Sequence, residues 1–139
     1  MLSEKEVMLL ETQFVEETRG VRVSVWPQYN KDQSRPSQSL FFYSYTVLIE
    51  NLGKLAISIH SRKWLIRDAF GKVSEIEGEG IVGKKPKLEP GESFTYTSYC
   101  PIRTPSGEMD GIFFTRDSQM TEYDLKVPIF TLSNPEFLN

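Results

Sequence analysis

The fold of this chain is decided by residues 21–26, Val21-Arg22-Val23-Ser24-Val25-Trp26, in which valine occupies every second position. Side chains of a β-strand project alternately to its two faces, so a period of two predicts a strand with one buried face. Residues 40–51 repeat this period, with apolar side chains at Tyr43, Tyr45, Val47 and Ile49. Both stretches are therefore predicted to be half-buried strands.

The period of two continues along the chain, and short turn sequences separate its occurrences. Further strands are expected at residues 55–59, 63–69, 72–77, 94–99, 111–115 and 123–132. Turn residues lie between them, for example Asn51-Leu52-Gly53 and Glu89-Pro90-Gly91. About seven to eight short strands without intervening helices predict an all-β fold, an antiparallel immunoglobulin-like or fibronectin type III-like β-sandwich.

Length and composition indicate one globular domain and exclude several classes of function. The 139 residues are 39% hydrophobic and 25% charged, which excludes a disordered tail or linker. The formal net charge of −3 offers no positive field to collect phosphates, so nucleic acid is not an expected partner. No apolar run approaches the roughly 18 residues of a membrane-spanning helix, so no membrane is expected as a partner. With a lone cysteine, Cys100, these features predict a cytoplasmic protein.

The charge is concentrated at the N-terminus. Residues 1–17 carry one base, Lys5, and five acids: Glu4, Glu6, Glu11, Glu16 and Glu17. The expected organisation is an acidic N-terminal arm at residues 1–17, followed by the sandwich domain at residues 18–139. Ser3 and Glu6 have the spacing of a helix capping box, so the arm is expected either to be mobile or to pack as one short helix.

Several blocks of the chain, in their order, resemble the ApaG family from about Val21 to Asn139. The blocks are residues 29–34 with Pro36, 43–51, 62–68 with Gly71, 77–83, Pro86, Leu88, 90–92, 96–98, 107–111 and 127–130. So many ordered elements are far more specific than any single short motif. The resemblance implies a fibronectin type III-like β-sandwich.

The resemblance also implies functions, in two directions. Members of the ApaG family occur alone in small bacterial proteins and as domains of some eukaryotic F-box and polymerase-interacting proteins, which implies a protein-binding module. The bacterial members are associated with diadenosine tetraphosphate hydrolysis and with cobalt and magnesium resistance. That association names no mechanism.

A glycine loop is the first candidate site. Gly78-Glu79-Gly80-Ile81-Val82-Gly83 fits the pattern G-x-G-x-x-G, which cradles pyrophosphate at a helix N-terminus in dinucleotide-binding folds. Pro86 follows closely and discourages that helix, which disfavours a dinucleotide site. A weaker phosphate site remains, an amide nest with neighbouring lysines. Its residues would be Gly78, Gly80, Gly83, Lys84 and Lys85. The favoured alternative is a loop shaped by glycines with solvated lysines.

Alternating acids form the second candidate. Glu75, Glu77 and Glu79 should project from one face of a strand, where carboxylates could bind a hard cation such as magnesium. A solvated strand face is the favoured alternative, because no further acid or amide nearby completes a cage. Cobalt would prefer imidazole or thiolate, and one histidine and one cysteine far apart do not make a site. We therefore predict no bound metal and no cofactor.

Aromatic residues and one arginine form the third candidate, an interaction surface. Phe42 and Phe114 each follow an aromatic neighbour, so alternation sends them to the outer faces of their strands. If outward aromatic residues cluster, they make an apolar patch suited to another protein or to a second copy of this chain; filling of the core is the alternative. Arg62 is a candidate ligand-facing side chain, with local pairing on the sheet as its alternative.

Catalysis is not expected. His60 has no recognisable nucleophile or partner carboxylate, and Cys100 precedes Pro101 and is expected to be a buried small hydrophobe. The predicted function is a non-enzymatic protein-interaction or regulatory module whose partner the sequence does not identify. The alternative is a binder of pyrophosphate or a nucleotide polyphosphate at the glycine loop, a phosphate-containing small molecule, linked to diadenosine polyphosphate or divalent-metal homeostasis.

Overall fold

The computed structural model describes residues 13–134 and consists of β-strands, turns and one short 3₁₀-helix, η1 (Pro36–Gln38). The strands are β1 (Phe14–Thr18), β2 (Val21–Tyr29), β3 (Phe41–Asn51), β4 (Ile57–Asp68), β5 (Val73–Glu79), β6 (Lys87–Leu88), β7 (Ser93–Ile102), β8 (Gly107–Asp117) and β9 (Glu122–Leu132). Within residues 13–134, no helix is long and apolar enough to cross a membrane.

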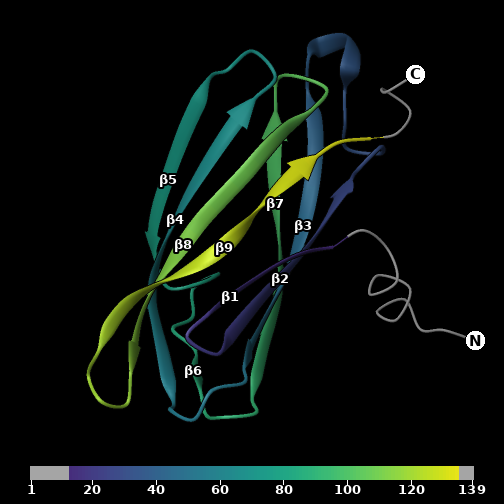
Figure 1. Ribbon diagram of the computed structural model, residues 1–139. Coiled ribbons are helices and arrows are strands. Elements are labelled where there is room, and N and C mark those ends of the chain that lie inside the picture. Colours follow the sequence, from purple (N-terminus) through teal and green to yellow (C-terminus); the bar gives the residue numbers. More distant parts are fainter. Residues whose placement is uncertain (1–12, 135–139) are drawn as a thin grey trace, which may run out of the picture.

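The strands form two antiparallel sheets packed face to face, as Figure 1 shows. One sheet has the order β1-β2-β3-β7, and the other has the order β5-β4-β8-β9, with β6 paired to β4. The predicted antiparallel β-sandwich is thus confirmed, with nine strands in the described residues rather than seven or eight. Strand β3 shows why the prediction succeeded, because its side chains alternate between buried and half-buried along its whole length.

The core lies between the sheets and is centred on Trp64 of β4. Its indole ring lies 5.3 Å from the ring of Tyr45 and about equally far from two phenylalanines, Phe113 at 6.0 Å and Phe130 at 6.1 Å. Tyr45 and Phe130 contact the indole ring from opposite sheets, since Tyr45 belongs to β3 and Phe130 to β9. Tilted and edge-on aromatic contacts of this kind contribute to core stability beyond their buried area.

Two boundaries differ from the sequence prediction. The expected strands at residues 55–59 and 63–69 are one strand, β4, in which a register shift between Ile59 and Ser61 makes a β-bulge at His60. Part of the predicted arm, Phe14–Thr18, is strand β1, which pairs with β2 along its full length. The rest of the predicted acidic arm, with the Ser3 and Glu6 capping box, lies outside the described residues.

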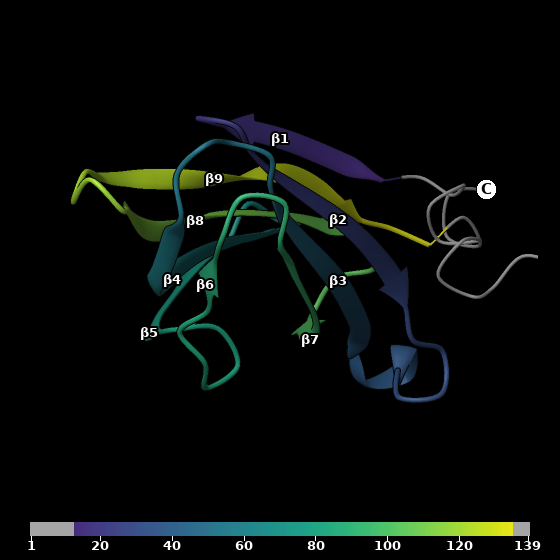
Figure 2. The same ribbon diagram turned by 90° about the horizontal axis from the view of Figure 1, so that it is seen from below.

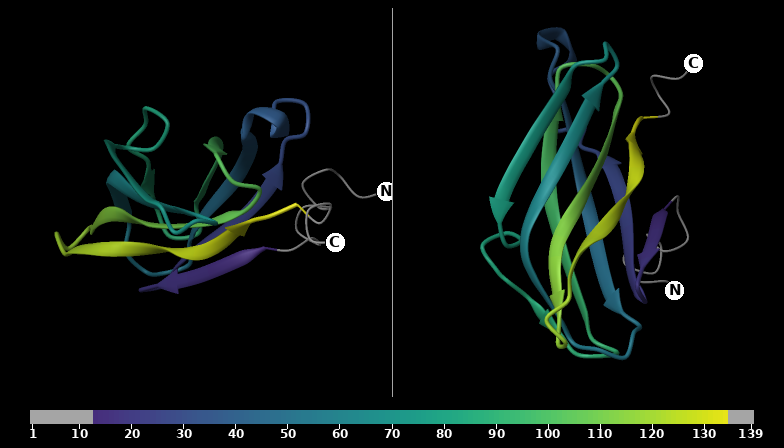
Figure 3. Two further views of the ribbon diagram at one scale, coloured as in Figure 1. Left: turned by 90° about the horizontal axis from the view of Figure 1, so that it is seen from above. Right: turned by 60° about the vertical axis from the view of Figure 1, so that its left-hand side comes forward.

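The two long sides of the sandwich are built differently. On one side β1 lies against β9, seen from below in Figure 2. There the rings of Phe14 and Phe130 are 6.4 Å apart, and the amide of Lys126 donates to Oγ1 of Thr18 over 3.4 Å. On the other side the edge strands β5 and β7 diverge, seen from above in the left part of Figure 3. We call these the closed side and the open side.

Candidate functional site

A groove follows the open side between β5 and β7. It has a volume of about 370 Å³, and it continues toward the β4–β5 turn into a shallower hollow of about 120 Å³ that shares Ile66, Ser74 and Pro101 with it. Its apolar side chains include Tyr45, Trp64, Ile66, Ile76, Cys100 and Met109. This volume is in the range of pockets that bind small ligands or a few residues of a peptide.

The groove exists because β7 does not reach across to cover β5. Alternation along β5 directs Ser74 and Ile76 toward the groove and directs Glu75 and Glu77 away from it. Ile76 faces the inside of the sandwich, yet 48% of its surface is exposed. An inward-facing isoleucine left half exposed is the clearest sign that this part of the core lacks a covering layer.

The floor of the groove is dry. Trp64, Cys100 and Met109 are almost completely buried, although they line it. Burial raises the pKa of the Cys100 thiol to about 11, so at neutral pH the sulfur is a protonated, apolar group. This agrees with the prediction of a small buried hydrophobe and leaves no reactive thiolate there.

Arg62 is the charged residue of the groove, and Gly78 makes its position accessible. The two residues face each other across β4 and β5, and a Cβ at position 78 would lie 2.8 Å from Nη1 of Arg62. The guanidinium therefore lies over the bare glycine backbone. Its Nη1 donates to the carbonyl oxygens of Glu79 at 3.1 Å and Gly80 at 2.9 Å.

Two hydroxyl-bearing residues of the opposite sheet, Tyr45 and Ser98, line the groove together with this charge. Tyr45 interacts with Ser98 through a side-chain hydrogen bond, and burial raises the pKa of Tyr45 while that bond and the charge of Arg62 oppose the increase. Burial also raises the pKa of Tyr96, again opposed by the charge of Arg62. The Tyr96 hydroxyl is buried and has no hydrogen-bond partner among the described residues. Buried hydroxyls are normally paired, which makes this one conspicuous.

The glycine loop uses its amides internally. The amide of Gly80 donates to His60 O at 2.6 Å, and residues 81 and 84 exchange two backbone hydrogen bonds across a tight turn. Val82 and Gly83 both have positive φ, as that turn requires. Gly78 meets Arg62 instead of joining this turn. The candidate nest is therefore a hairpin turn whose bonded amides point at protein carbonyls.

The lysines of the candidate phosphate site are exposed. Lys85 Nζ lies 3.4 Å from a carboxylate oxygen of Glu79, and both side chains are more than half exposed. Lys84 is exposed and gives its backbone amide to Ile81. This arrangement matches the alternative in which the glycines shape a loop and the lysines are solvated.

The alternating acids share one face, as predicted. Lys63 of β4 lies between two of them, with Nζ 3.0 Å from Glu75 and 3.9 Å from Glu77. The hydrogen bond to Glu75 and its charge raise the pKa of Lys63. In the part of the chain that the structure describes, no group of three or more His, Cys, Asp or Glu side chains could hold a metal ion.

The three candidate interaction residues do not form one surface. Arg62 lies in the groove, Phe42 lies on the outer face of the β3–β7 sheet with its ring 5.7 Å from that of Tyr99, and Phe114 lies on the other sheet. Phe114 lines a separate hollow of about 330 Å³ with the bulge residue His60. Both phenylalanines point outward, as predicted, but they lie on different sheets and do not form an aromatic cluster.

Sequence reasoning named Arg62 and missed the rest of the groove. The signal was present in β5, where Ser74, Ile76 and Gly78 alternate with acids and form a face too small and polar for a core. It was also present in β7, where Ser98 interrupts the buried positions between Tyr96 and Cys100. Neither signal identifies which strands diverge, because strand order is a tertiary property.

Proteins of similar sequence are ApaG proteins. Protein ApaG of Methylobacterium sp. (strain 4-46) is 42% identical over 119 residues, which cover 86% of this chain and 92% of that protein. Protein ApaG of Caulobacter vibrioides is 42% identical over 118 residues, which cover 85% of this chain and 84% of that protein.

Solved structures and a family profile agree with these relatives. The crystal structure of the ApaA protein from Bordetella pertussis superposes with a TM-score of 0.81 at 37% identity, covering 90% of this chain and 98% of that one. The C-terminal domain of wzt, at 11% identity and a TM-score of 0.52, shares the fold alone. The profile of the ApaG domain matches residues 31–117, and with the relatives that match over most of both chains, it shows that this chain belongs to the ApaG family.

Proposed function

We propose that this chain is a non-enzymatic protein-interaction module that binds an extended segment of a partner protein in the groove between β5 and β7. The single observation that carries the proposal is Ile76, an inward-facing core residue that remains 48% exposed because no strand covers it. Covering such a side chain releases water from apolar surface at about 25 cal/mol per Å². A partner segment would therefore complete the core.

The backbone of the groove supports the same function. Strands β5 and β7 are both edge strands, each with hydrogen-bond partners on one side only in the described sheets. An edge strand is a template for an added strand, and extended peptides commonly bind in this way. The walls thus supply backbone donors and acceptors, and the floor supplies apolar contacts.

The ends of the groove carry positive charge. Arg62 lies at one end, and two cations, Lys72 and Arg103, line the hollow at the other end together with one acid, Asp68, so both ends have a net positive charge. In residues 13–134, none of these three cations lies within ion-pair distance of a carboxylate. A partner segment with negative charge is therefore favoured over a basic one.

The competing functions have less support. The thiol of Cys100 is protonated at neutral pH, and His60 lies in a different hollow, so the groove offers no nucleophile with a base. A pyrophosphate or nucleotide polyphosphate site at the glycine loop would lack the amides of Gly80, Ile81 and Lys84, which already bond to protein carbonyls. A cytoplasmic location belongs to the proposal as well, because a lone buried cysteine needs no oxidising compartment.

Site-specific photocrosslinking tests the proposal. A benzoylphenylalanine at position 76 places the crosslinker in the groove, and one at position 77 provides a matched control on the same strand, directed away from it. We expect crosslinks from position 76 to a segment of another protein in lysate of the producing cells, mapped by mass spectrometry, and none from position 77. Equal crosslinking from both positions, or no crosslink from position 76, would overturn the proposed function.

A further inference from the structure

The two ends of the groove differ. One end is blocked by the chain itself, and Arg62 lies at this closed end of the groove. Beyond Arg62 the chain leaves β5, buries Ile81 completely and returns to pair Lys87 and Leu88 with the first residues of β4. This return places β6 beside the first residues of β4, toward the lower end of the sandwich in Figure 1. At the other end the groove continues into the hollow near Lys72 and Arg103. An extended chain lying in the groove therefore meets a wall at Arg62.

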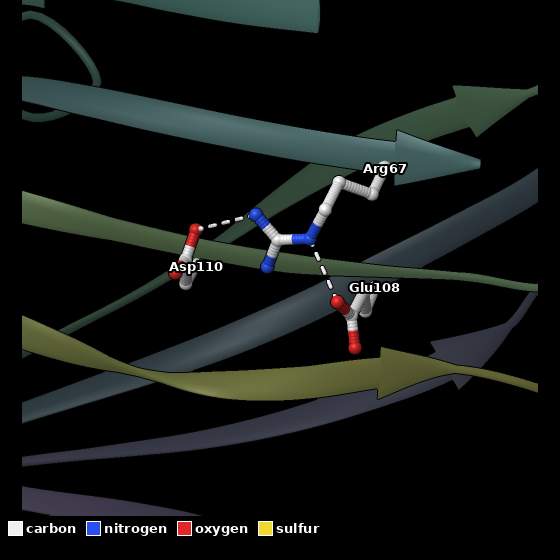
Figure 4. Close-up of polar contacts among 3 residues, drawn as sticks. All are labelled: Arg67, Glu108 and Asp110. Carbon is white, nitrogen blue, oxygen red and sulfur yellow. Dashed lines mark hydrogen bonds and ion pairs between the residues drawn. The ribbon is translucent and has the colours of Figure 1, made fainter. Parts of the chain in front are cut away.

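Arg62 differs from an arginine on the same strand, Arg67. Arg67 points to the outer face of the sheet, where Nε lies 2.7 Å from Glu108 and Nη1 lies 3.4 Å from Asp110 (Figure 4). Arg62 points inward, and within residues 13–134 only its Nη1 has hydrogen-bond partners, both of them carbonyl oxygens. A partly buried guanidinium without a carboxylate has donors and charge left to satisfy.

Two neighbouring hydroxyl groups also have a donor available. Tyr45 and Ser98 of the opposite sheet line the groove together with Arg62, and the hydrogen bond between them uses only one of their two O–H groups. Hydroxyl groups and a guanidinium are donors, and a carboxylate is acceptor-only, so one carboxylate can satisfy several of them at once. A phosphate would carry more charge than a single arginine in a mostly apolar groove balances.

Resting on the proposed function, we propose that the closed end of the groove binds the C-terminal carboxylate of the partner protein, with Arg62, Ser98 and the hydroxyl of Tyr45 as its donors. The last side chain of the partner packs on Ile76 and Trp64, and its preceding residues run along β5 or β7 toward Lys72 and Arg103. An internal acidic residue is disfavoured, because the chain would have to continue past the wall at Arg62.

A two-arm peptide selection tests the carboxylate. Random hexapeptides are displayed with a free C-terminus in one arm and with the C-terminus fused to the carrier in the other, and both are selected on the full-length protein. Enrichment confined to the free arm supports the inference. Equal enrichment in both arms, with peptides that reduce crosslinking from position 76, overturns the inference and leaves the proposed function standing. Enrichment in neither arm overturns both.

Variants of the protein then test the donors with a selected peptide and its C-terminal amide. Arg62→Gln should weaken binding of the peptide with a free C-terminus by roughly tenfold or more, which is the loss expected for a charge-assisted hydrogen bond. Arg67→Gln is the matched control on the same strand and should leave binding unchanged. Because Arg62 also holds the chain at residues 79 and 80, Tyr45→Phe is the second variant, which removes a hydroxyl of the groove and keeps the ring in the core.

The phenylalanine variant separates binding from folding. Tyr45→Phe should lower thermal stability only slightly, because the ring contacts with Trp64 and Phe130 remain. It should nevertheless weaken binding of the free-acid peptide roughly tenfold and leave the weaker binding of the amide unchanged. Binding of the free acid within twofold of the wild-type protein in both Arg62→Gln and Tyr45→Phe would overturn the assignment.

Discussion

The closed and open sides of the sandwich both have inward-facing apolar side chains, but these side chains are buried on the closed side and partly exposed on the open side. On the closed side, β1 lies against β9 and Phe130 is completely buried, with ring contacts to Phe14, Tyr45 and Trp64. On the open side, Ile76 also faces inward from its sheet, yet it is 48% exposed. The fate of an inward-facing side chain is therefore set by whether the opposite sheet extends over it.

This difference explains why a small domain can hold both a stable core and a binding site. Burial on the closed side supplies stability, since aromatic side chains bury the largest areas. The open side contributes little to stability and keeps its apolar surface and unpaired strand edges available. Stability and binding are thus assigned to opposite edges of the same two sheets.

The largest effect expected is on the closed side. Phe130→Ala should lower the free energy of unfolding by about 3–5 kcal/mol, because it leaves a cavity between the sheets. Ile76→Ala should lower it by less than about 1 kcal/mol, because water already covers much of that side chain. Urea unfolding of both variants measures the contrast. Similar losses for the two variants would contradict the division into closed and open sides.

Two glycines at the end of the groove give the next effect. Gly80 has φ +64°, and a Cβ there would lie 2.2 Å from the carbonyl oxygen of Lys84, so Gly80→Ala should cost more than about 2 kcal/mol. Gly78→Ala should cost less than about 1 kcal/mol, since the Cβ meets only the movable end of Arg62. Thermal unfolding measures both. A smaller cost at Gly80 than at Gly78 would contradict this view of the loop.

Alkaline titration tests whether the groove floor is dry. Burial raises the pKa of Cys100 from 9.0 to about 11, so the folded state holds the thiol proton more tightly than the unfolded state. The resulting stability is fully present below about pH 9 and is lost as the pH rises through about 11, and it amounts to at most about 3 kcal/mol. Cys100→Ala should remove this part of the decline in urea unfolding. An identical decline in wild type and variant would show that water reaches the floor.

The smallest effect is expected at the lysines of the glycine loop. The double variant Lys84→Ala, Lys85→Ala should leave stability and groove binding unchanged, because both side chains are exposed outside the groove. Amide NMR titration of the wild-type protein with pyrophosphate should show no saturable shift centred on residues 78–87 at millimolar ligand. A saturable shift that the double variant abolishes would favour the phosphate-binding alternative instead.

The fold was predictable because a period of two is visible in single strands. Alternation over Val21–Trp26 and along β3 identified strands and their buried faces without knowledge of their neighbours. The bulge at His60 was not predictable, since inserting one residue changes only the pairing with β8 and leaves two stretches that look like separate strands.

The site was predictable only in fragments. Arg62 was singled out by its charge, and Gly78 by the glycine pattern, but their contact across β4 and β5 depends on the register of the pair. The same glycine pattern was assigned to a phosphate candidate, because sequence spacing does not reveal which amides already have partners. In the structure, the amides of Gly80, Ile81 and Lys84 have carbonyl partners at a turn in which Val82 and Gly83 have positive φ.

The sequence by itself determined the family, the all-β class and the inward or outward direction of most side chains, because these depend on residue types and on spacing along one strand. The tertiary structure alone decided that β5 and β7 diverge, that Arg62 lines one groove with Tyr45 and Ser98, and that Phe42 and Phe114 lie on different sheets. These features depend on strand order and sheet separation, which follow from how the whole core packs and are not encoded by any local pattern.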